Sequence, residues 1–414
     1  MPRKKGSRFV LVMVLASSLL LLLSAFGVLP RPVRGAKRFQ TDRGQITEPV
    51  VSKPEGNGDE QEPDDSQASQ GPEQPEASGI TLMELPVTGN EADSLPAGGT
   101  SLRVWPEALS IPVLHAPDLG SYIGQATSPE PLRGITVILD ASHGGADTGA
   151  VWGTGTSAVM EKTLVLDMAM EAEKALAAQG ATVVMTRTTD EEFSLFRTVA
   201  KAADIALLRY GDAAVANGYE REIPDNLRLL MGDIIRINQN SASSGGRGLF
   251  GSIGTPPQLR ILYDIESQFR DIIFINLSLA FDINDPSKQG SQAYFMSSSF
   301  VSEVNNGYAE GQDAQALAPN YSNIDSEGRA RLASLLKASL ARMEPLLQPE
   351  DQVNAGAEKD MAVLRLTNYV SVSLVPGYLS NDSDRRVMTS QQGRQAIGQA
   401  VANAVLQYYV TERP

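Results

Sequence analysis

The sequence predicts an α/β protein: a twisted, mostly parallel sheet of about six strands flanked by helices, preceded by an N-terminal transmembrane helix and a disordered tether. Two observations predict the sheet. Short β-branched apolar runs recur along the second half of the chain, and longer amphipathic stretches of helix length separate them. The tether and the transmembrane helix are predicted from the composition of the first hundred residues.

The N-terminus predicts a membrane anchor. A basic tail, residues 1–8, precedes the uncharged run Phe9–Leu29. As a helix this run would be about 31 Å long, enough to cross a bilayer, whereas a signal peptide has an apolar region of roughly 7–15 residues. We therefore predict a single-pass protein of the cell membrane with its C-terminal domain extracytoplasmic. The run Ala25-Phe26-Gly27 leaves signal-peptide cleavage open.

Composition excludes several classes of site and partner. The 414 residues include no cysteine, which excludes disulfides and thiolate sites. The net charge of -14 repels phosphate backbones, so we expect no nucleic-acid partner. Residues 30–130 are rich in Pro, Gly, Ser and acidic residues, and we predict an acidic disordered linker. Two apolar patches in it, Ile80–Pro86 and Leu102–Tyr122, are candidates for short strands that pack on the domain.

The domain, residues 131–414, alternates strands and helices around an insertion at 209–270. Before the insertion we predict strands at Ile135–Leu139 and Ala181–Met185 and helices at Glu161–Gln179 and Phe193–Leu208. Within it, Asn226–Ile237 and Gln258–Phe269 are helix-like. After it we predict strands or extended segments at Ile272–Leu277, Gln292–Met296, Met361–Leu366 and Val370–Val375, and helices at Ser326–Leu347 and Ser390–Val410.

Three motifs punctuate this domain. Leu139-Asp140-Ala141-Ser142-His143-Gly144-Gly145 ends a strand, Glu161-Lys162 opens a helix, and Gly377-Tyr378-Leu379-Ser380-Asn381 precedes the last helix. Together and in this order they resemble motifs of the N-acetylmuramoyl-L-alanine amidase 3 family. Those zinc-dependent enzymes cut the amide that joins muramic acid to the first alanine of peptidoglycan. The resemblance implies the α/β fold, an extracytoplasmic location and a cell-wall substrate.

The resemblance also implies site residues. The family holds zinc with two His and one Glu and uses a second Glu as the general base. His143 and Glu161 match the first two ligands, but Ser278 stands at the third-ligand position and Val375 at the catalytic Glu position. A hydroxyl is a poor zinc ligand at neutral pH, and valine cannot accept a proton. Zinc binding is therefore expected to be weak or absent, and enzyme activity stays open.

Other residues give weaker indications. Asp140, Asp147 and Asn381 are candidates for the groove, with Asp140 and Asp147 as acceptors that orient the loop. His115 is a surface residue by default, and it supplies the missing ligand only if residues 102–124 fold over the site. Substitute bases in the insertion are Glu220, Glu222, Asp225 and Glu266. A serine hydrolase that uses Ser278 and His143 is disfavoured because no G-x-S-x-G turn is present.

The sequence thus leaves three functions. The first is a pseudoenzyme that binds peptidoglycan or a cell-wall, division or sporulation protein without hydrolysis. The second is a working zinc amidase with a remodelled site. The third is a pure assembly protein that binds neither zinc nor glycan.

Overall fold

The computed structural model describes residues 111–238, 260–309, 323–349 and 355–411. The predicted anchor Phe9–Leu29, the patch Ile80–Pro86 and most of the predicted linker lie outside these residues. Within the described ranges, no helix combines the length and the apolar character needed to cross a bilayer.

A six-stranded sheet in the order β4-β1-β5-β8-β6-β7 forms the centre of the domain. Strands β4 (Thr182–Met185), β1 (Thr136–Ala141), β5 (Ile272–Leu277) and β8 (Val370–Val375) are mutually parallel. Strand β6 (Gln292–Phe295) is antiparallel to β8, and β7 (Ala357–Glu358) is parallel to β6. The predicted mostly parallel α/β sheet is confirmed. Strands β1, β5 and β8 are buried along their whole length. Accordingly β1 and β5 are mostly apolar without strict alternation, whereas β8 alternates Val and Ser over its first four residues.

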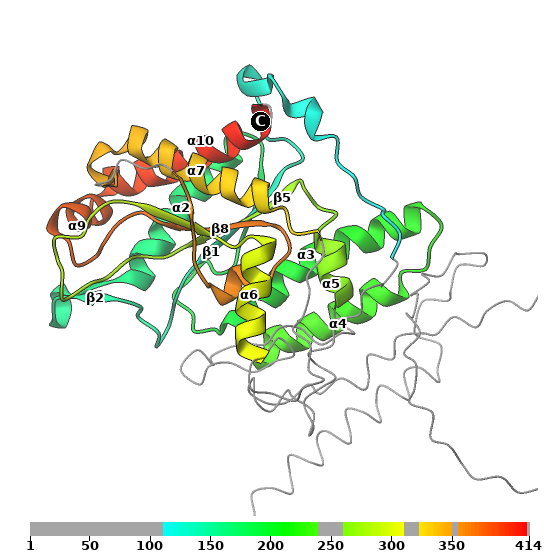
Figure 1. Cartoon of the computed structure of the whole chain (residues 1–414), viewed down its shortest axis with the longest axis horizontal. Helices are drawn as coiled ribbons and strands as arrows, with labels where there is room; N and C mark the ends of the chain where they lie inside the picture. Colours follow the sequence, from blue (N-terminus) through cyan, green and yellow to red (C-terminus); the bar gives the residue numbers. More distant parts are fainter. Residues whose placement is uncertain (1–110, 239–259, 310–322, 350–354, 412–414) are drawn as a thin grey trace, which may run out of the picture.

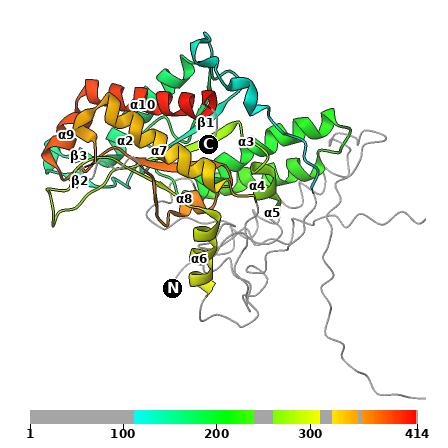
Figure 2. The same ribbon diagram turned by 45° about the horizontal axis from the view of Figure 1, so that its top comes forward.

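Helices cover both faces of the sheet (Figure 1). One face packs against α2 (Glu161–Ala177), α7 (Ser326–Met343) and α10 (Gln391–Val410), with α10 lying between α2 and α7 (Figure 2). The other face packs against α3 (Leu195–Ala216), α4 (Glu222–Ile237), α5 (Arg260–Glu266) and α8 (Ala362–Arg365). Each face has its own apolar core.

The remaining elements lie around the sheet. A hairpin of β2 (Val151–Trp152) and β3 (Val159–Met160) precedes α2. Helix α6 (Ser298–Ala309) follows β6, and α9 (Asp382–Thr389) precedes α10. Helix α9 lies at the same end of the molecule as the hairpin (Figure 2). Ser390 is the N-cap of α10, because its hydroxyl accepts a hydrogen bond from the Gly393 N–H.

The prediction of an extended segment at Met361–Leu366 is wrong, because this run contains the short helix α8. A short apolar run does not by itself distinguish a strand from a buried helix turn. Tertiary contacts decide here: buried Arg329 of α7 donates to the carbonyl oxygens of Leu364 and Thr367, at 3.4 and 2.8 Å. These bonds hold the end of the helical turn against α7.

Residues 111–130 lie against the domain, although the sequence assigned them to the linker. They form an extended segment and two short 3-10 helices, Leu119–Tyr122 and Gln125–Thr127, rather than strands. The Tyr210 hydroxyl donates to the Pro112 carbonyl at 2.8 Å, and the Gly124 N–H donates to the Val410 carbonyl at 3.0 Å. Residues before 131 therefore pack as part of the domain.

Candidate functional site

His143 lies in the loop that follows β1, at the edge of the sheet where the parallel strands end. Its φ of +64° is a left-handed conformation that non-glycine residues adopt rarely. Such backbone strain persists only where surrounding contacts enforce it, and it gathers at functional sites. The loop around His143 is therefore held by its neighbours.

Arg187, two residues after the end of β4, is the main contact that holds this loop. Its side chain is 1% exposed. The guanidinium donates to the carbonyl oxygens of Ala141 at 2.8 Å, Ser142 at 3.2 Å and Lys162 at 2.6 Å. Burial lowers the pKa of Arg187, with nearby acids opposing this. Arg187 was not among the residues selected from the sequence. A basic residue two positions after the predicted strand Ala181–Met185 was the available signal.

A second contact fixes the glycines that follow His143. Asp190 accepts from the Gly145 N–H at 2.7 Å and from the Lys162 ammonium, also at 2.7 Å. The Lys162 ammonium also donates to the Gly145 carbonyl at 2.6 Å. A Cβ at Gly144 would lie 2.2 Å from the Glu191 carbonyl oxygen, so only glycine fits there. The His143 loop is thereby bound to the segment that follows β4.

Glu161 is the first residue of α2, and its carboxylate is buried with 4% exposure. One oxygen, Oε1, accepts the Leu279 N–H at 2.6 Å, and the other, Oε2, accepts the Ala150 N–H at 2.9 Å. Gly149 makes room for this arrangement. A Cβ at that position would lie 2.7 Å from both Glu161 Oε2 and His143 Cδ2.

His143 lies between two carboxylates. Its Nδ1 is 2.8 Å from Asp147 Oδ2, and its Nε2 is 3.4 Å from Glu161 Oε2. Burial alone would lower the pKa of His143, but the hydrogen bonds and charges of Glu161 and Asp147 raise it to about 9. Burial opposes the change at Asp147, whose pKa is lowered by His143 and by the Gly149 N–H. The imidazole is thus held as a cation at neutral pH.

Ser278, at the position of the family's third ligand, follows the end of β5. Its hydroxyl lies 3.4 Å from the Ser373 hydroxyl, and its N–H donates to the Leu374 carbonyl. Its hydroxyl is thus within hydrogen-bond distance of β8. The Ser278–His143 pair that a serine hydrolase requires is not formed.

Asp140 belongs to a buried polar row beneath the site. It is 4% exposed and accepts from the Thr186 hydroxyl and the Asn276 amide, each at 2.7 Å. Burial raises the pKa of Asp140 against these hydrogen bonds. Asn276 in turn accepts from the Ser373 hydroxyl at 2.7 Å. The row ties four neighbouring strands together. Asn276, a polar residue inside an apolar strand, was the signal that sequence reasoning passed over.

Val375 and Asn381 occupy the other two positions taken from the sequence motifs. Val375 is the last residue of β8 and is 4% exposed. Asn381 caps α9: its side-chain oxygen accepts from the Ser383 and Asp384 N–H groups, and its amide donates to the Pro286 carbonyl. The structure gives Asn381 a capping role.

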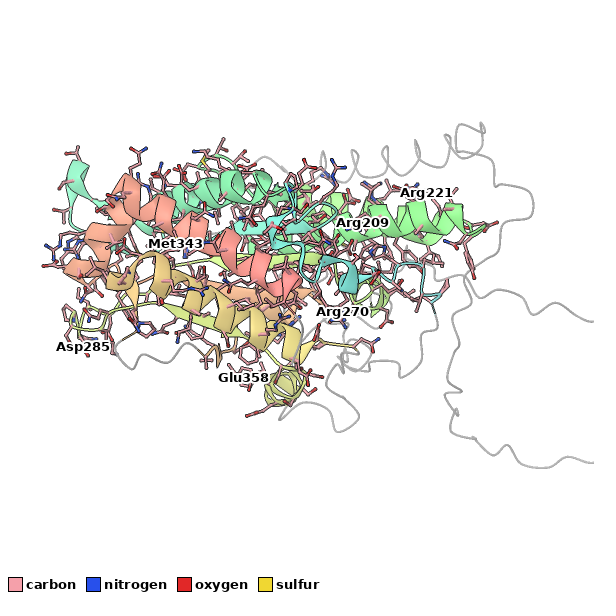
Figure 3. All side chains as sticks on the ribbon, turned by 90° about the horizontal axis from the view of Figure 1, so that it is seen from above. Arg209, Arg221, Arg270, Asp285, Met343 and Glu358 are labelled. Carbon is pink, nitrogen blue, oxygen red and sulfur yellow. The ribbon has the colours of Figure 1, made fainter. Side chains whose placement is uncertain are left out.

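His115 lies at the opposite, amino-terminal edge of the sheet. Its Nε2 is 2.8 Å from Asp271 Oδ1, and Asp271 directly precedes β5. Figure 3 shows both ends: Asp285, in the loop after β5, lies at one end, and Arg209 and Arg270 lie toward the other. His115 therefore does not complete the site at His143.

The acids of the insertion are engaged elsewhere or lie on its helices. Glu266 accepts the Asn368 N–H at 2.6 Å, and burial raises the pKa of Glu266 to about 8. Asp225 accepts from Arg221 at 2.9 Å. Glu222 opens α4, and Glu220 lies just before it.

The residues present do not fit a three-ligand zinc centre. Two atoms bound to one zinc at about 2.0–2.2 Å in a tetrahedral site lie about 3.4 Å apart, and His143 Nε2 and Glu161 Oε2 have this separation. A third donor is missing: across the described residues, no group of three or more His, Asp or Glu side chains is placed to hold one ion. An ion at His143 would also have to displace the imidazolium proton.

The match to a family model identifies the family. The model of N-acetylmuramoyl-L-alanine amidase matches residues 137–208 and 268–407, which is just over half of the chain. The chain belongs to the N-acetylmuramoyl-L-alanine amidase family. The unmatched stretch between the two parts, residues 209–267, nearly coincides with the segment interpreted above as an insertion. The amidase fold thus accounts for the sheet and for the loop that carries His143.

Curated relatives match over a short part of the chain. The chain is 44% identical over 71 residues to the probable cell wall amidase LytH of Staphylococcus epidermidis, covering 17% of this chain and 24% of that protein. It is 46% identical over 65 residues to LytH of Staphylococcus aureus, covering 16% and 22%. The chain thus spans about a quarter of the length of these relatives.

Solved amidases resemble this chain more distantly. The amidase AmiC2 of Nostoc punctiforme has a TM-score of 0.38 at 17% identity, over 66% of this chain and 97% of that one. The CwlD amidase of Clostridioides difficile, solved in complex with the GerS lipoprotein, has a TM-score of 0.38 at 18% identity, over 66% and 98%.

Proposed function

We propose that this protein is a membrane-anchored member of the amidase family that binds peptidoglycan without hydrolysing it. The observation that carries this proposal is the donor set at the site. His143 and Glu161 have the separation of two ligands, but Ser278 faces Ser373 and the buried Val375 stands where the family has its base. One ligand and the proton-transfer group are replaced together, so the hydrolytic step has neither its ion nor its base.

The alternative is a working zinc amidase with a remodelled site. The 3.4 Å spacing of His143 and Glu161 favours it, as does Asp147, which orients the imidazole as carboxylates do behind metal-bound histidines. The ion would then need ligands from outside the described residues.

One experiment separates the two functions. The full chain, purified in detergent, is analysed for metal content and then incubated with isolated peptidoglycan. We expect well below one zinc per chain, no release of stem peptides, and sedimentation of the protein with the glycan. About one zinc per chain together with released stem peptides would establish the working amidase. Metal-free protein that stays in the supernatant would instead favour a binding site for a protein partner or a pure assembly role.

The membrane location is proposed from Phe9–Leu29, which is long enough to span a bilayer. In this arrangement the acidic segment that follows separates the amidase domain from the membrane. Membrane fractionation tests it, followed by protease treatment of intact cells stripped of wall. The domain should sediment with membranes and be digested from outside. Digestion only after lysis would contradict an extracytoplasmic domain.

A further inference from the structure

The Glu161 carboxylate closes a ring of contacts around the loops at the carboxyl edge of the sheet. It binds Leu279, which follows β5, and Ala150, which leads into the hairpin β2–β3. Both bonds go to main-chain N–H groups, so they fix backbone position whatever side chains surround them. A buried carboxylate with two such donors forms charge-assisted hydrogen bonds.

The ring continues from β5 to the segment before α9. The Ala280 N–H donates to the Gly377 carbonyl at 3.1 Å, and the Leu379 N–H donates to the Ala280 carbonyl at 2.8 Å. Arg385 of α9 donates to the Leu379 carbonyl at 3.0 Å. The loop after β5 and the segment after β8 are thus one unit.

Arg385 completes the ring at the hairpin. Its guanidinium carbon lies 4.1 Å from the centre of the Trp152 ring, a cation–π contact. Trp152 is in β2, two residues from Ala150, which returns the ring to Glu161. Three loops from distant parts of the chain are thereby held together by side chains of α2 and α9, through protein atoms alone.

We propose that in this chain Glu161 is a metal-independent positioning residue, whose bonds to Ala150 and Leu279 hold these three loops in a binding-competent arrangement. This inference rests on the proposed function, and it replaces the role of ligand that the family gives to this position. The incomplete donor set supports it, since no complete three-ligand site is present among the described residues to organise these loops.

The test measures amide hydrogen exchange at Ala150 and Leu279 in the full chain, with a chelator and with added zinc. In the native protein we expect slow exchange at both amides, unchanged by either addition. Glu161→Gln keeps the length of the side chain but replaces one acceptor with a donor. Exchange at one or both amides should then rise at least about 10-fold, with a melting temperature lower by about 5 °C.

Glu173→Gln is the matched control, because it makes the same change on the same helix away from the ring. It should leave the exchange at both amides and the binding of peptidoglycan unchanged, whereas Glu161→Gln should weaken that binding. Faster exchange of the native protein after chelation would overturn the proposal, even if Glu161→Gln fails to fold. Slow, chelator-insensitive exchange at both amides without peptidoglycan binding would support the positioning role of Glu161 and reject the proposed function.

Discussion

The two histidines of the chain lie at opposite edges of the sheet, and each is 2.8 Å from an aspartate. At the amino-terminal edge, one acid, Asp271, is shared by two basic groups, His115 and Arg209. At the carboxyl edge, one imidazole, His143, is shared by two acids. The His–Asp distance is therefore the same at both edges, although His115 uses Nε2 and His143 uses Nδ1, and the second partner differs in charge.

The second partner has opposite electrostatic effects. Burial would raise the pKa of Asp271, but the hydrogen bonds and charges of His115 and Arg209 lower it, so this edge neutralises its own acid. At His143 burial would lower the pKa of the imidazole, but Glu161 and Asp147 together raise it to about 9, and the two acids leave negative charge around it. The first arrangement fastens residues 111–117 to the domain. The arrangement at the carboxyl edge is suited to holding a cation, and here that cation is the proton on the His143 imidazole.

The largest expected effect comes from restoring the missing ligand at the carboxyl edge. Ser278→His should tighten zinc binding at least about 100-fold, because it adds a third imidazole or carboxylate donor, and even second-shell changes alter metal affinity 10–100-fold. Competition with a chelator measures this. Adding His143→Ala to the same variant should abolish the gain. Unchanged affinity would mean that more than position 278 has been lost.

Removing an arginine from each edge should have unequal effects. Arg187→Met leaves several buried carbonyls without a donor, so we expect about 4 kcal/mol less stability. Arg209 is 29% exposed, and Arg209→Met should lower the free energy of unfolding by about 1 kcal/mol. Urea unfolding compares the two. Equal losses would show that the His143 loop is no more tightly held than the His115 segment.

Glu266, near the amino-terminal edge, predicts a pH dependence. Burial raises its pKa from 4.5 to about 8, against the Asn368 N–H and the charge of Arg329. The folded state therefore keeps this proton longer than the unfolded state does. The resulting stability is full below pH 4.5 and is lost as the pH rises toward 8, by about 4 kcal/mol at that pH.

Urea unfolding of the native protein and of Glu266→Gln, from pH 5 to 8, measures this loss. The native protein should weaken relative to the variant across that range. Exposed Glu327→Gln is the control and should track the native protein. Parallel profiles for native protein and Glu266→Gln would place the pKa of Glu266 near its ordinary value.

Alanine substitutions at two glycines with positive φ can distinguish the cost of backbone strain from the cost of steric crowding at His143. A Cβ added to Gly149 (φ +60°) would lie 2.7 Å from His143 and from Glu161, whereas one added to Gly218 (φ +76°) would have nothing within 4 Å. Gly218→Ala should lower the free energy of unfolding by about 1 kcal/mol from the backbone alone. Gly149→Ala should lower it by about 2 kcal/mol. Thermal unfolding measures the loss of stability in both variants. Equal losses would show that a Cβ at Gly149 causes no steric crowding at the site.

The smallest effect is expected at the other histidine. His115→Ala removes the bond to Asp271 and the stacking on Phe269, whose ring centre is 4.4 Å away. We expect a loss of about 1 kcal/mol, with faster amide exchange confined to residues 111–124. Exchange that also rises around His143 would show that the two edges are coupled.

Much of the fold followed from local pattern. The strands Ile272–Leu277 and Val370–Val375 were predicted with the boundaries that the structure has. The first is a nearly continuous apolar run, and the second alternates β-branched Val with Ser over its first four residues. The segment Met361–Leu366 failed because its length and composition suit either a strand or a helical turn. Only Arg329, far away in sequence, decides between them.

The candidate site divides in the same way. The sequence alone determined which residue types stand at its positions: His143 and Glu161 present, Ser278 and Val375 in place of a ligand and a base. Their contact partners follow from the tertiary structure, because Glu161 bonds to Leu279, more than a hundred residues away in sequence, and His115 lies at the opposite edge of the sheet. The sequence fixes which donor groups a chain has. Whether these groups act as metal ligands or as structural hydrogen-bond partners depends on distances that are set by packing between distant segments.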